Sequence, residues 1–163
     1  MNARRMRGVY VVEFAIIGLM LFILLFGVLE MGRLYYTVNT LNEVVRRGAR
    51  LAAVCNISDK QVILERAIFD TVGGDGTSEL VGGLKSSHVT LTYLDENGAL
   101  VGNPADEAGV NGFRAIRYVH LEVANFTFYL LIPTLGKTIT LPVFRATLPR
   151  ESLGRSVEGN TQC

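Results

Sequence analysis

The 163-residue sequence lacks the motifs that mark the common enzyme classes. It has no Gly-x-Ser-x-Gly nucleophile elbow and no glycine-rich loop ending in Gly-Lys-Ser/Thr, and neither His88 nor His120 has a cysteine or carboxylate at metal-ligand spacing. Sixteen Lys and Arg residues nearly balance 15 Asp and Glu residues, so no overall field attracts nucleic acid. We therefore expect no catalytic site, metal, cofactor, nucleic-acid partner or small-molecule substrate.

Proline and charge are both scarce in the N-terminal third. No proline occurs between Val9 and Val54, and Glu13 is the only charged residue from Val9 to Leu29. A helix from Val9 to Leu29 would rise roughly 30 Å, which is enough to cross the hydrocarbon core of a membrane. The segment after it, beginning at Glu30, contains no small-residue signal-peptidase site, and Cys55 lies too far along to be a lipoprotein cysteine. The span is therefore expected to remain in the mature protein.

The residues before the apolar run are basic. Arg4, Arg5 and Arg7 precede it, and no acidic residue occurs before Glu13. A cationic leader before an apolar span predicts that the leader stays in the cytoplasm and that the rest is exported. On the exported side a disulfide between the two cysteines, Cys55 and Cys163, is permitted; the alternative is two unrelated thiols.

Glu13 stands out because it lies inside the apolar run. A carboxylate at the centre of a membrane costs about 2.5–3.5 kcal/mol on insertion scales, and less near an interface. One interpretation places Glu13 at the interfacial edge, with its carboxylate reaching the head groups. Its surroundings favour another, because Gly8 precedes Val9 and Glu13 is the fifth residue counted from Val9.

The leader ends in Arg4-Arg5-Met6-Arg7-Gly8, and it is followed by Val9-Tyr10-Val11-Val12-Glu13-Phe14 and the apolar run. This arrangement resembles the type IV pilin signal. The resemblance implies that a prepilin peptidase cuts between Gly8 and Val9 on the cytoplasmic face and that Glu13, followed by Phe14, serves assembly. The new α-amine of one subunit would pair with the carboxylate of a neighbour. A misplaced register would leave a charge unpaired, so Glu13 would select the stagger between subunits.

Further stretches narrow the resemblance. Four of them are Arg7-Gly8, Val12 to Ala15, Phe26 to Arg33 and Arg46 to Val54. Together they look like the TadE-like family, which comprises the minor pilins or pseudopilins of the Tad (tight adherence, Flp) pilus system. The likeness covers about the first third of the chain, and Tyr129 to Pro149 is similar in pattern only. The major Flp pilin is little more than the helix, whereas this chain continues far beyond it, which favours a minor subunit over the shaft.

The resemblance implies a set of partners and a location. The partners would be the major Flp-type pilin, other minor pilins, the prepilin peptidase, the pilus assembly platform and inner-membrane lipid, in a pilus that serves adherence or related secretion. Residues 1–8 would be the cytoplasmic leader, 9–30 the transmembrane helix, 31–55 its continuation, and 56–163 a periplasmic or extracellular α+β domain. The alternative is a signal-anchored periplasmic binding or sensor domain that does not polymerise.

Helical periodicity continues past the membrane segment. An apolar stripe with alternating four- and three-residue steps consists of Leu34, Val38, Leu41, Val45, Gly48 and Ala52. The stripe is most simply core for the following domain; the alternative is a face that packs on other pilins. Ser58 to Gln61 then reads as a capping box that opens a second helix through about Val72, and glycine-rich residues 73–83 read as a loop.

The C-terminal part alternates like an antiparallel sheet. Strands are predicted at Val89 to Leu94, at Ile116 to Val123, and at Ile139 to Phe144, with Pro142 making the last an edge or bulged strand. Asp95 to Gly98 suits a tight turn. Phe126 to Pro133 is a core strand or short helix, or else an exposed patch for a membrane or partner pilin. The chain is therefore predicted to adopt a pilin-like α+β fold, with a long helix, a short helix and a small antiparallel sheet. His120 and Glu122 are predicted to form a polar pair on the surface of this sheet.

Overall fold

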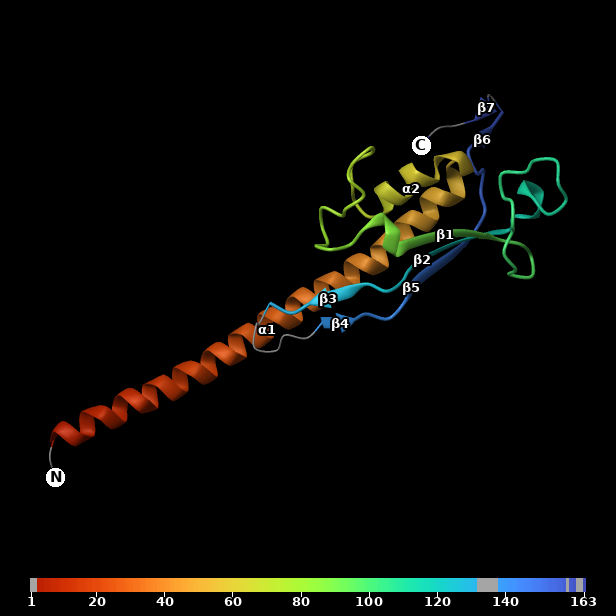
Figure 1. Cartoon of the computed structure of the whole chain (residues 1–163). Coiled ribbons are helices and arrows are strands. Elements are labelled where there is room, and N and C mark those ends of the chain that lie inside the picture. Colours follow the sequence, from red (N-terminus) through yellow and green to blue (C-terminus); the bar gives the residue numbers. More distant parts are fainter. Residues whose placement is uncertain (1–2, 132–137, 158, 161–162) are drawn as a thin grey trace.

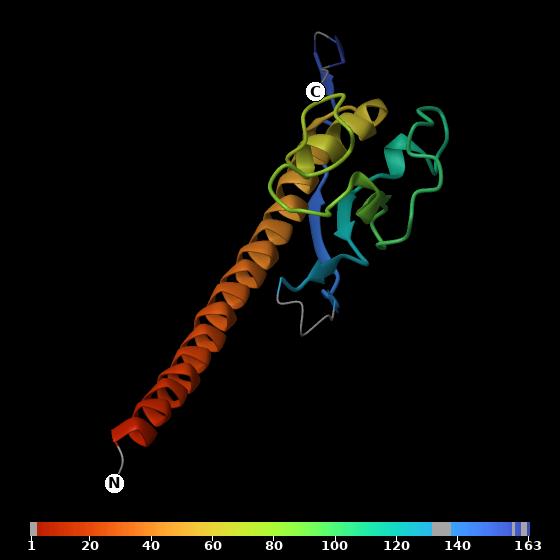
Figure 2. The ribbon, with the colours of Figure 1, turned by 60° about the vertical axis from the view of Figure 1, so that its left-hand side comes forward.

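A long helix carries a small α+β domain on its C-terminal half (Figure 1). The computed structural model describes residues 3–131, 138–157, 159–160 and 163, with side chains from residue 8 onward. Helix α1 runs from Ala3 to Val54. It continues unbroken because no proline removes a backbone donor within it. The predicted α+β class is confirmed, and Figure 2 shows the N-terminal half of α1 projecting from the domain as a free rod.

The second half of α1 supplies one wall of the core. Of the predicted stripe, Leu41, Val45, Gly48 and Ala52 are buried, and Leu34 and Val38 are partly buried against the core. The core interpretation of the stripe is therefore confirmed. Gly48 marks the closest approach, because a Cβ there would lie 2.8 Å from the Ala67 Cβ and 2.9 Å from Leu121 Cδ1.

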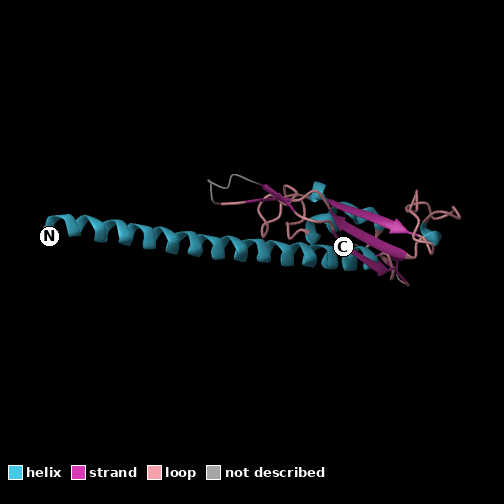
Figure 3. Cartoon of the chain, turned by 90° about the horizontal axis from the view of Figure 1, so that it is seen from below, coloured by secondary structure: helices cyan, strands magenta, loops and turns pink. Residues whose placement is uncertain are grey.

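A three-stranded antiparallel sheet packs on this half of α1 (Figure 3). Its order is β1 (Val89–Leu94), β2 (Tyr118–Val123) and β5 (Phe144–Pro149), so β5 is an edge strand. In register, Leu91 faces Leu121 and Leu121 faces Ala146. Alternate residues of β1 and β2 are buried, as the sequence pattern predicts.

The second helix is shorter than predicted, and the prediction of a capping box at Ser58 to Gln61 is wrong. Helix α2 spans Lys60–Ala67, after a 3-10 turn at Ile57–Asp59. Asn56 caps the 3-10 turn, where its side chain accepts a hydrogen bond from the Ser58 N–H at 3.0 Å, whereas the N-cap of α2, Asp59, makes no side-chain capping bond. The helix ends before Val72 because Phe69 adopts a left-handed backbone conformation, with φ of 61°.

The predicted strand from Ile139 to Phe144 is divided. Strand β3 (Thr127–Tyr129) pairs with β4 (Thr138–Thr140) in a separate small hairpin, and β5 begins only at Phe144. Pro142 lies between β4 and β5, where its missing N–H interrupts no ladder. The predicted strand is therefore divided between two sheets, with β4 in one and the start of β5 in the other. The hairpin β3–β4 lies beside the middle of α1 (Figure 1).

The C-terminal segment closes over the end of α1. The Leu153 N–H donates to Ala53 O at 3.1 Å and the Gly154 N–H donates to Val54 O at 2.6 Å, before the short hairpin of β6 (Arg155–Ser156) and β7 (Gly159–Asn160). Gly154 has φ of 76°, and a Cβ there would collide with the backbone of Asn56. Backbone donors from the far end of the sequence thus satisfy carbonyls that the helix terminus leaves free.

Candidate assembly and membrane-boundary site

The N-terminal half of α1 is apolar and unpacked. Among the described residues, α1 is the one helix long and apolar enough to cross a membrane, and its most apolar stretch of 18 residues has a mean hydropathy of 2.7 with none of it buried. Phe14 is 78% exposed. In water such a surface would be very costly, so the helix fits a single-pass membrane anchor.

The predicted cleavage and assembly residues all lie on this exposed half. Gly8 and Val9 are helical and exposed near the start of α1, and Glu13 is exposed one turn further on. Val9 and Glu13 are four residues apart, so they share a helix face and differ in height by about 6 Å. No ion pair joins Glu13 to any side chain that the structure describes.

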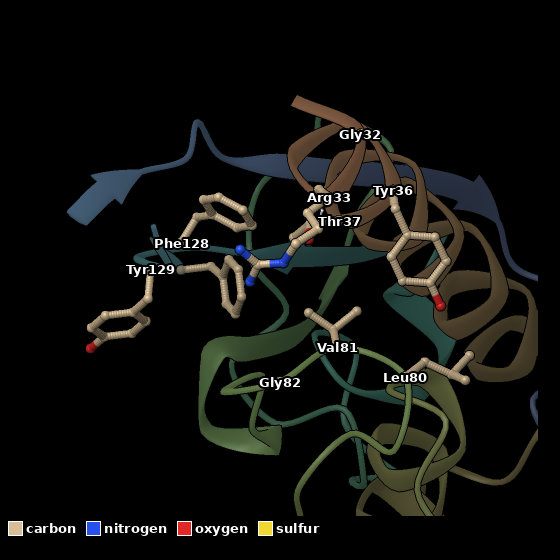
Figure 4. Close-up of a pocket in the computed structure, with 10 residues that line it drawn as sticks. Gly32, Arg33, Tyr36, Thr37, Leu80, Val81, Gly82, Phe128 and Tyr129 are labelled. Atoms are coloured by element: carbon tan, nitrogen blue, oxygen red, sulfur yellow. Dashed lines mark hydrogen bonds between the residues drawn. The ribbon is translucent and has the colours of Figure 1, made fainter. Parts of the chain in front are cut away.

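A second carboxylate, Glu30, ends the apolar run and is satisfied within the chain. Glu30 is 7% exposed. One of its oxygens accepts from Arg33 Nη1 at 2.8 Å, and both lie 3.3 Å from the Leu131 N–H. The Arg33 guanidinium in turn lies 5.1 Å from the centre of the Phe128 ring, and Figure 4 shows it extending from α1 toward that ring. Glu30 and Arg33 therefore fasten the β3–β4 hairpin to the helix.

Sequence reasoning missed this fastening. Glu30 is the first charged residue after the apolar run, and Arg33 follows at the i+3 spacing that places two side chains on one helix face. That signal was sufficient to predict the pair. The hydrogen bond from the Leu131 amide could not be predicted from the sequence, because Leu131 lies 101 residues away along the chain.

A cavity of about 400 Å³ opens just beyond this fastening, between α1, β3 and the loop before β1 (Figure 4). It is lined by Gly32, Arg33, Tyr36, Thr37, Leu80, Val81, Gly82, Phe126, Phe128 and Tyr129. Its polar groups already serve the fold: Arg33 pairs with Glu30, and the Thr37 hydroxyl donates to Arg33 O at 3.0 Å. No carboxylate and no histidine lines it.

The remaining predicted residues lie elsewhere in the domain. His120 Nε2 is 3.6 Å from Glu122 Oε2, and its Nδ1 is 2.7 Å from Thr147 Oγ1, so the predicted surface pair is confirmed. Cys55 and Cys163 are joined by a disulfide with their Cα atoms 5.6 Å apart. Neither feature approaches the N-terminal half of α1.

Glu65 is a buried carboxylate that no sequence pattern singled out. It accepts hydrogen bonds from the Gly73 N–H at 2.9 Å and from Gln61 Nε2 at 2.8 Å. These donors, the Gly73 amide first, hold the pKa of Glu65 below its ordinary value of 4.5. The charged carboxylate thus ties the glycine-rich loop to α2, which is a structural role.

Together these features define an α+β protein whose described residues contain one helix of membrane length, α1. It presents an exposed carboxylate, Glu13, near its start and a satisfied one, Glu30, where its apolar run ends. Residues 8–50 match the model of the TadE-like protein family, so the resemblance to that family is confirmed over this segment. The match contains Glu13, Glu30 and Arg33. No curated protein and no solved structure gives a match. The family implies an association with the Tad pilus.

Proposed function

We propose that this chain is a minor pilin or pseudopilin of a Tad-type pilus, which enters the filament or primes its assembly for adherence or related secretion. The observation that carries the proposal is the TadE-like match at residues 8–50, which coincides with an unpacked apolar helix bearing an exposed Glu13. Such a helix needs lipid before assembly and neighbouring helices after it. The following domain makes a minor subunit a better fit than the shaft.

The contrast between the two carboxylates supports this role. Glu30 already has Arg33 and the Leu131 amide, whereas Glu13 makes no ion pair with the side chains described. A partner for Glu13 therefore has to come from the leader or from another subunit. The α-amine freed at Val9 of a neighbour is the partner proposed here. It meets Glu13 when the two helices are offset by about 6 Å, which fixes the stagger.

Cleavage between Gly8 and Val9 is the step that would create this amine. The site lies within the helix, with the leader arginines on the cytoplasmic side of the proposed topology. A prepilin peptidase would have to open the first turns of α1 to reach the peptide bond. Glycine at position 8 lowers the cost of that opening, because glycine is about 1 kcal/mol less favourable in a helix than alanine.

The remaining partners follow from the proposed role. The exposed apolar half of α1 would lie among inner-membrane lipids, with the domain in the periplasm, until the assembly platform moves the subunit into a filament of the major Flp-type pilin and other minor pilins. We propose no enzymatic activity for the chain.

The test is Glu13→Ala in a strain that assembles the pilus, with Glu43→Ala as the matched control. Glu43 is an exposed glutamate on the same helix but beyond the apolar run. Glu13→Ala is expected to leave membrane insertion and cleavage intact and to reduce recovery of the subunit in sheared pili, or pilus number, at least several-fold. Glu43→Ala should match the unaltered chain.

The competing role, an anchored periplasmic binding or sensor domain that never polymerises, gives a different result. In that case Glu13→Ala and Glu43→Ala would behave alike, and neither the variants nor the unaltered chain would be recovered with pili. That outcome would overturn the proposal.

A further inference from the structure

The β3–β4 hairpin lies at the height where α1 leaves the membrane. Glu30 is the first charged residue after the apolar run, so it marks the water boundary of the span. Its carboxylate oxygens lie 3.3 Å from the Leu131 N–H. One turn further from the membrane, Arg33 lies over Phe128. Each step along β3 toward Leu131 therefore descends α1 toward the lipid.

The hairpin has one face for the core and one face that no described part of the chain covers. Phe126 and Phe128 are buried. Tyr129 and Leu131 are 65% and 62% exposed, and Figure 4 shows Tyr129 pointing away from α1. Ile139 is paired with Phe128 in the ladder, so it lies on the core side of the hairpin, where it is 39% exposed. Of the segment predicted as a core strand or short helix, or else as an exposed patch, Phe126 to Leu131 therefore contain both core and exposed positions, and residues 132–133 lie outside the described residues.

The composition around this face suits lipid. Residues 126–131 and 138–144 contain no Asp, Glu, Lys or Arg, so these described residues bring no charge to a bilayer. Lys137, directly before β4, lies outside the described residues. Tyr36, which is 53% exposed, lines the same cavity as Tyr129. Helix side chains lean toward the helix N-terminus, here toward the membrane, and tyrosine is enriched at membrane interfaces.

We propose that the exposed face formed by Tyr129 and Leu131 rests on the outer surface of the inner membrane and inserts among its head groups and upper acyl chains. Lipid is the occupant because this face lies at the end of the apolar run of α1, next to the membrane surface, and is fixed there by the contact of Leu131 with Glu30. The hairpin thereby sets the depth and tilt of the subunit before assembly. The inference rests on the membrane span and is independent of whether the chain enters a pilus.

The sequence contains no tryptophan, so a single introduced tryptophan is a clean reporter. We would place it by Leu131→Trp and, in a second variant, by Tyr129→Trp. The matched control is Tyr118→Trp, because Tyr118 is 40% exposed at the end of β2 that pairs with Leu94 and Pro149, away from the hairpin. Each full-length variant is reconstituted at high dilution in vesicles of mixed phosphatidylethanolamine and phosphatidylglycerol, with and without bromine on the acyl chains.

The expected result is a blue-shifted emission and a several-fold stronger quenching by brominated lipid for Leu131→Trp and Tyr129→Trp than for Tyr118→Trp. Adding Glu30→Ala to Leu131→Trp should weaken the quenching, because the hairpin loses its fastening. Equal, weak quenching in all three single variants would overturn the proposal. A blue shift without lipid quenching, which disappears as protein is diluted into more lipid, would also overturn it and would assign the face to a second copy of the chain.

Discussion

Two carboxylates bracket the apolar half of α1, and their surroundings assign them different tasks. Glu30 is buried and hydrogen-bonded to Arg33 and to a backbone amide, so its negative charge is balanced within the subunit. Glu13 is exposed on a surface that only lipid or another subunit can cover. In low dielectric an unpaired charge is expensive, so under the proposed function Glu13 would discriminate between subunit registers more than it would add net stability.

Tyr93 carries a cost that a single substitution would remove. It is 5% exposed, and its hydroxyl has no hydrogen-bond partner within the described part of the chain. Burying an unsatisfied hydroxyl costs about 1–3 kcal/mol. Tyr93→Phe should therefore raise the free energy of unfolding by about 1 kcal/mol or more, measured by denaturant titration of the full chain in detergent with near-ultraviolet circular dichroism.

The same residue predicts a pH dependence. Burial raises the pKa of Tyr93 from 10.0 to about 12, since the phenolate is poorly solvated in the core. The folded state therefore holds this proton more tightly than the unfolded state, and the associated stability is present below pH 10 and lost as the pH rises through 12. The unaltered chain should lose stability relative to Tyr93→Phe over that window. A constant difference between the two would contradict the burial of the hydroxyl.

At the scale of elements, local patterns were sufficient where neighbours in sequence decide the structure. Strand β1 has the predicted bounds Val89–Leu94, and Gly98, with φ of 77°, forms the predicted turn through its N–H to Asp95 O at 3.2 Å. The division of Ile139 to Phe144 was missed because it depends on pairing with β3 and β2. That choice is made by tertiary contacts, which a pattern along one segment does not contain.

Gly48 tests the packing of α1 on the domain. A Cβ there would lie 2.8 Å from the Ala67 Cβ, whereas a Cβ at Gly32, on the same helix, would meet nothing within 4 Å. Alanine gains up to about 1 kcal/mol of helix propensity at either position, but overpacking typically costs about 1–3 kcal/mol. Gly48→Ala should lower the unfolding free energy and Gly32→Ala should not, by the same titration in detergent. Equal effects would mean that α1 does not approach α2 this closely.

At the scale of the whole molecule, the two ends of the domain meet at the end of α1. Cys55 is 1% exposed, and the Cys163 N–H donates to Asp59 Oδ2 at 3.1 Å. The disulfide joins residues 108 apart in the sequence. The sequence allowed this bridge without requiring it, because the approach of the C-terminal segment depends on the backbone bonds of Leu153 and Gly154 to α1.

We propose that the bridge forms in the exported protein, which predicts the effect of Cys163→Ser. Closing a loop of this length typically contributes about 2–5 kcal/mol through the unfolded chain. Cys163→Ser should lower the unfolding free energy by that order, and reducing the unaltered chain should lower it equally. Insertion of α1 into membranes should be unchanged. Should reduction leave the stability of the unaltered chain the same, the bridge is absent from the exported protein.

The central claim is that the apolar helix is an assembly element cut after Gly8, and the mass of the chain in sheared pili tests it most directly. The account predicts a chain that begins at Val9 in the filament fraction, and an uncut chain confined to the membrane when the prepilin peptidase is inactive. A chain that keeps the leader in cells with active peptidase, and that is absent from the filaments, would contradict it.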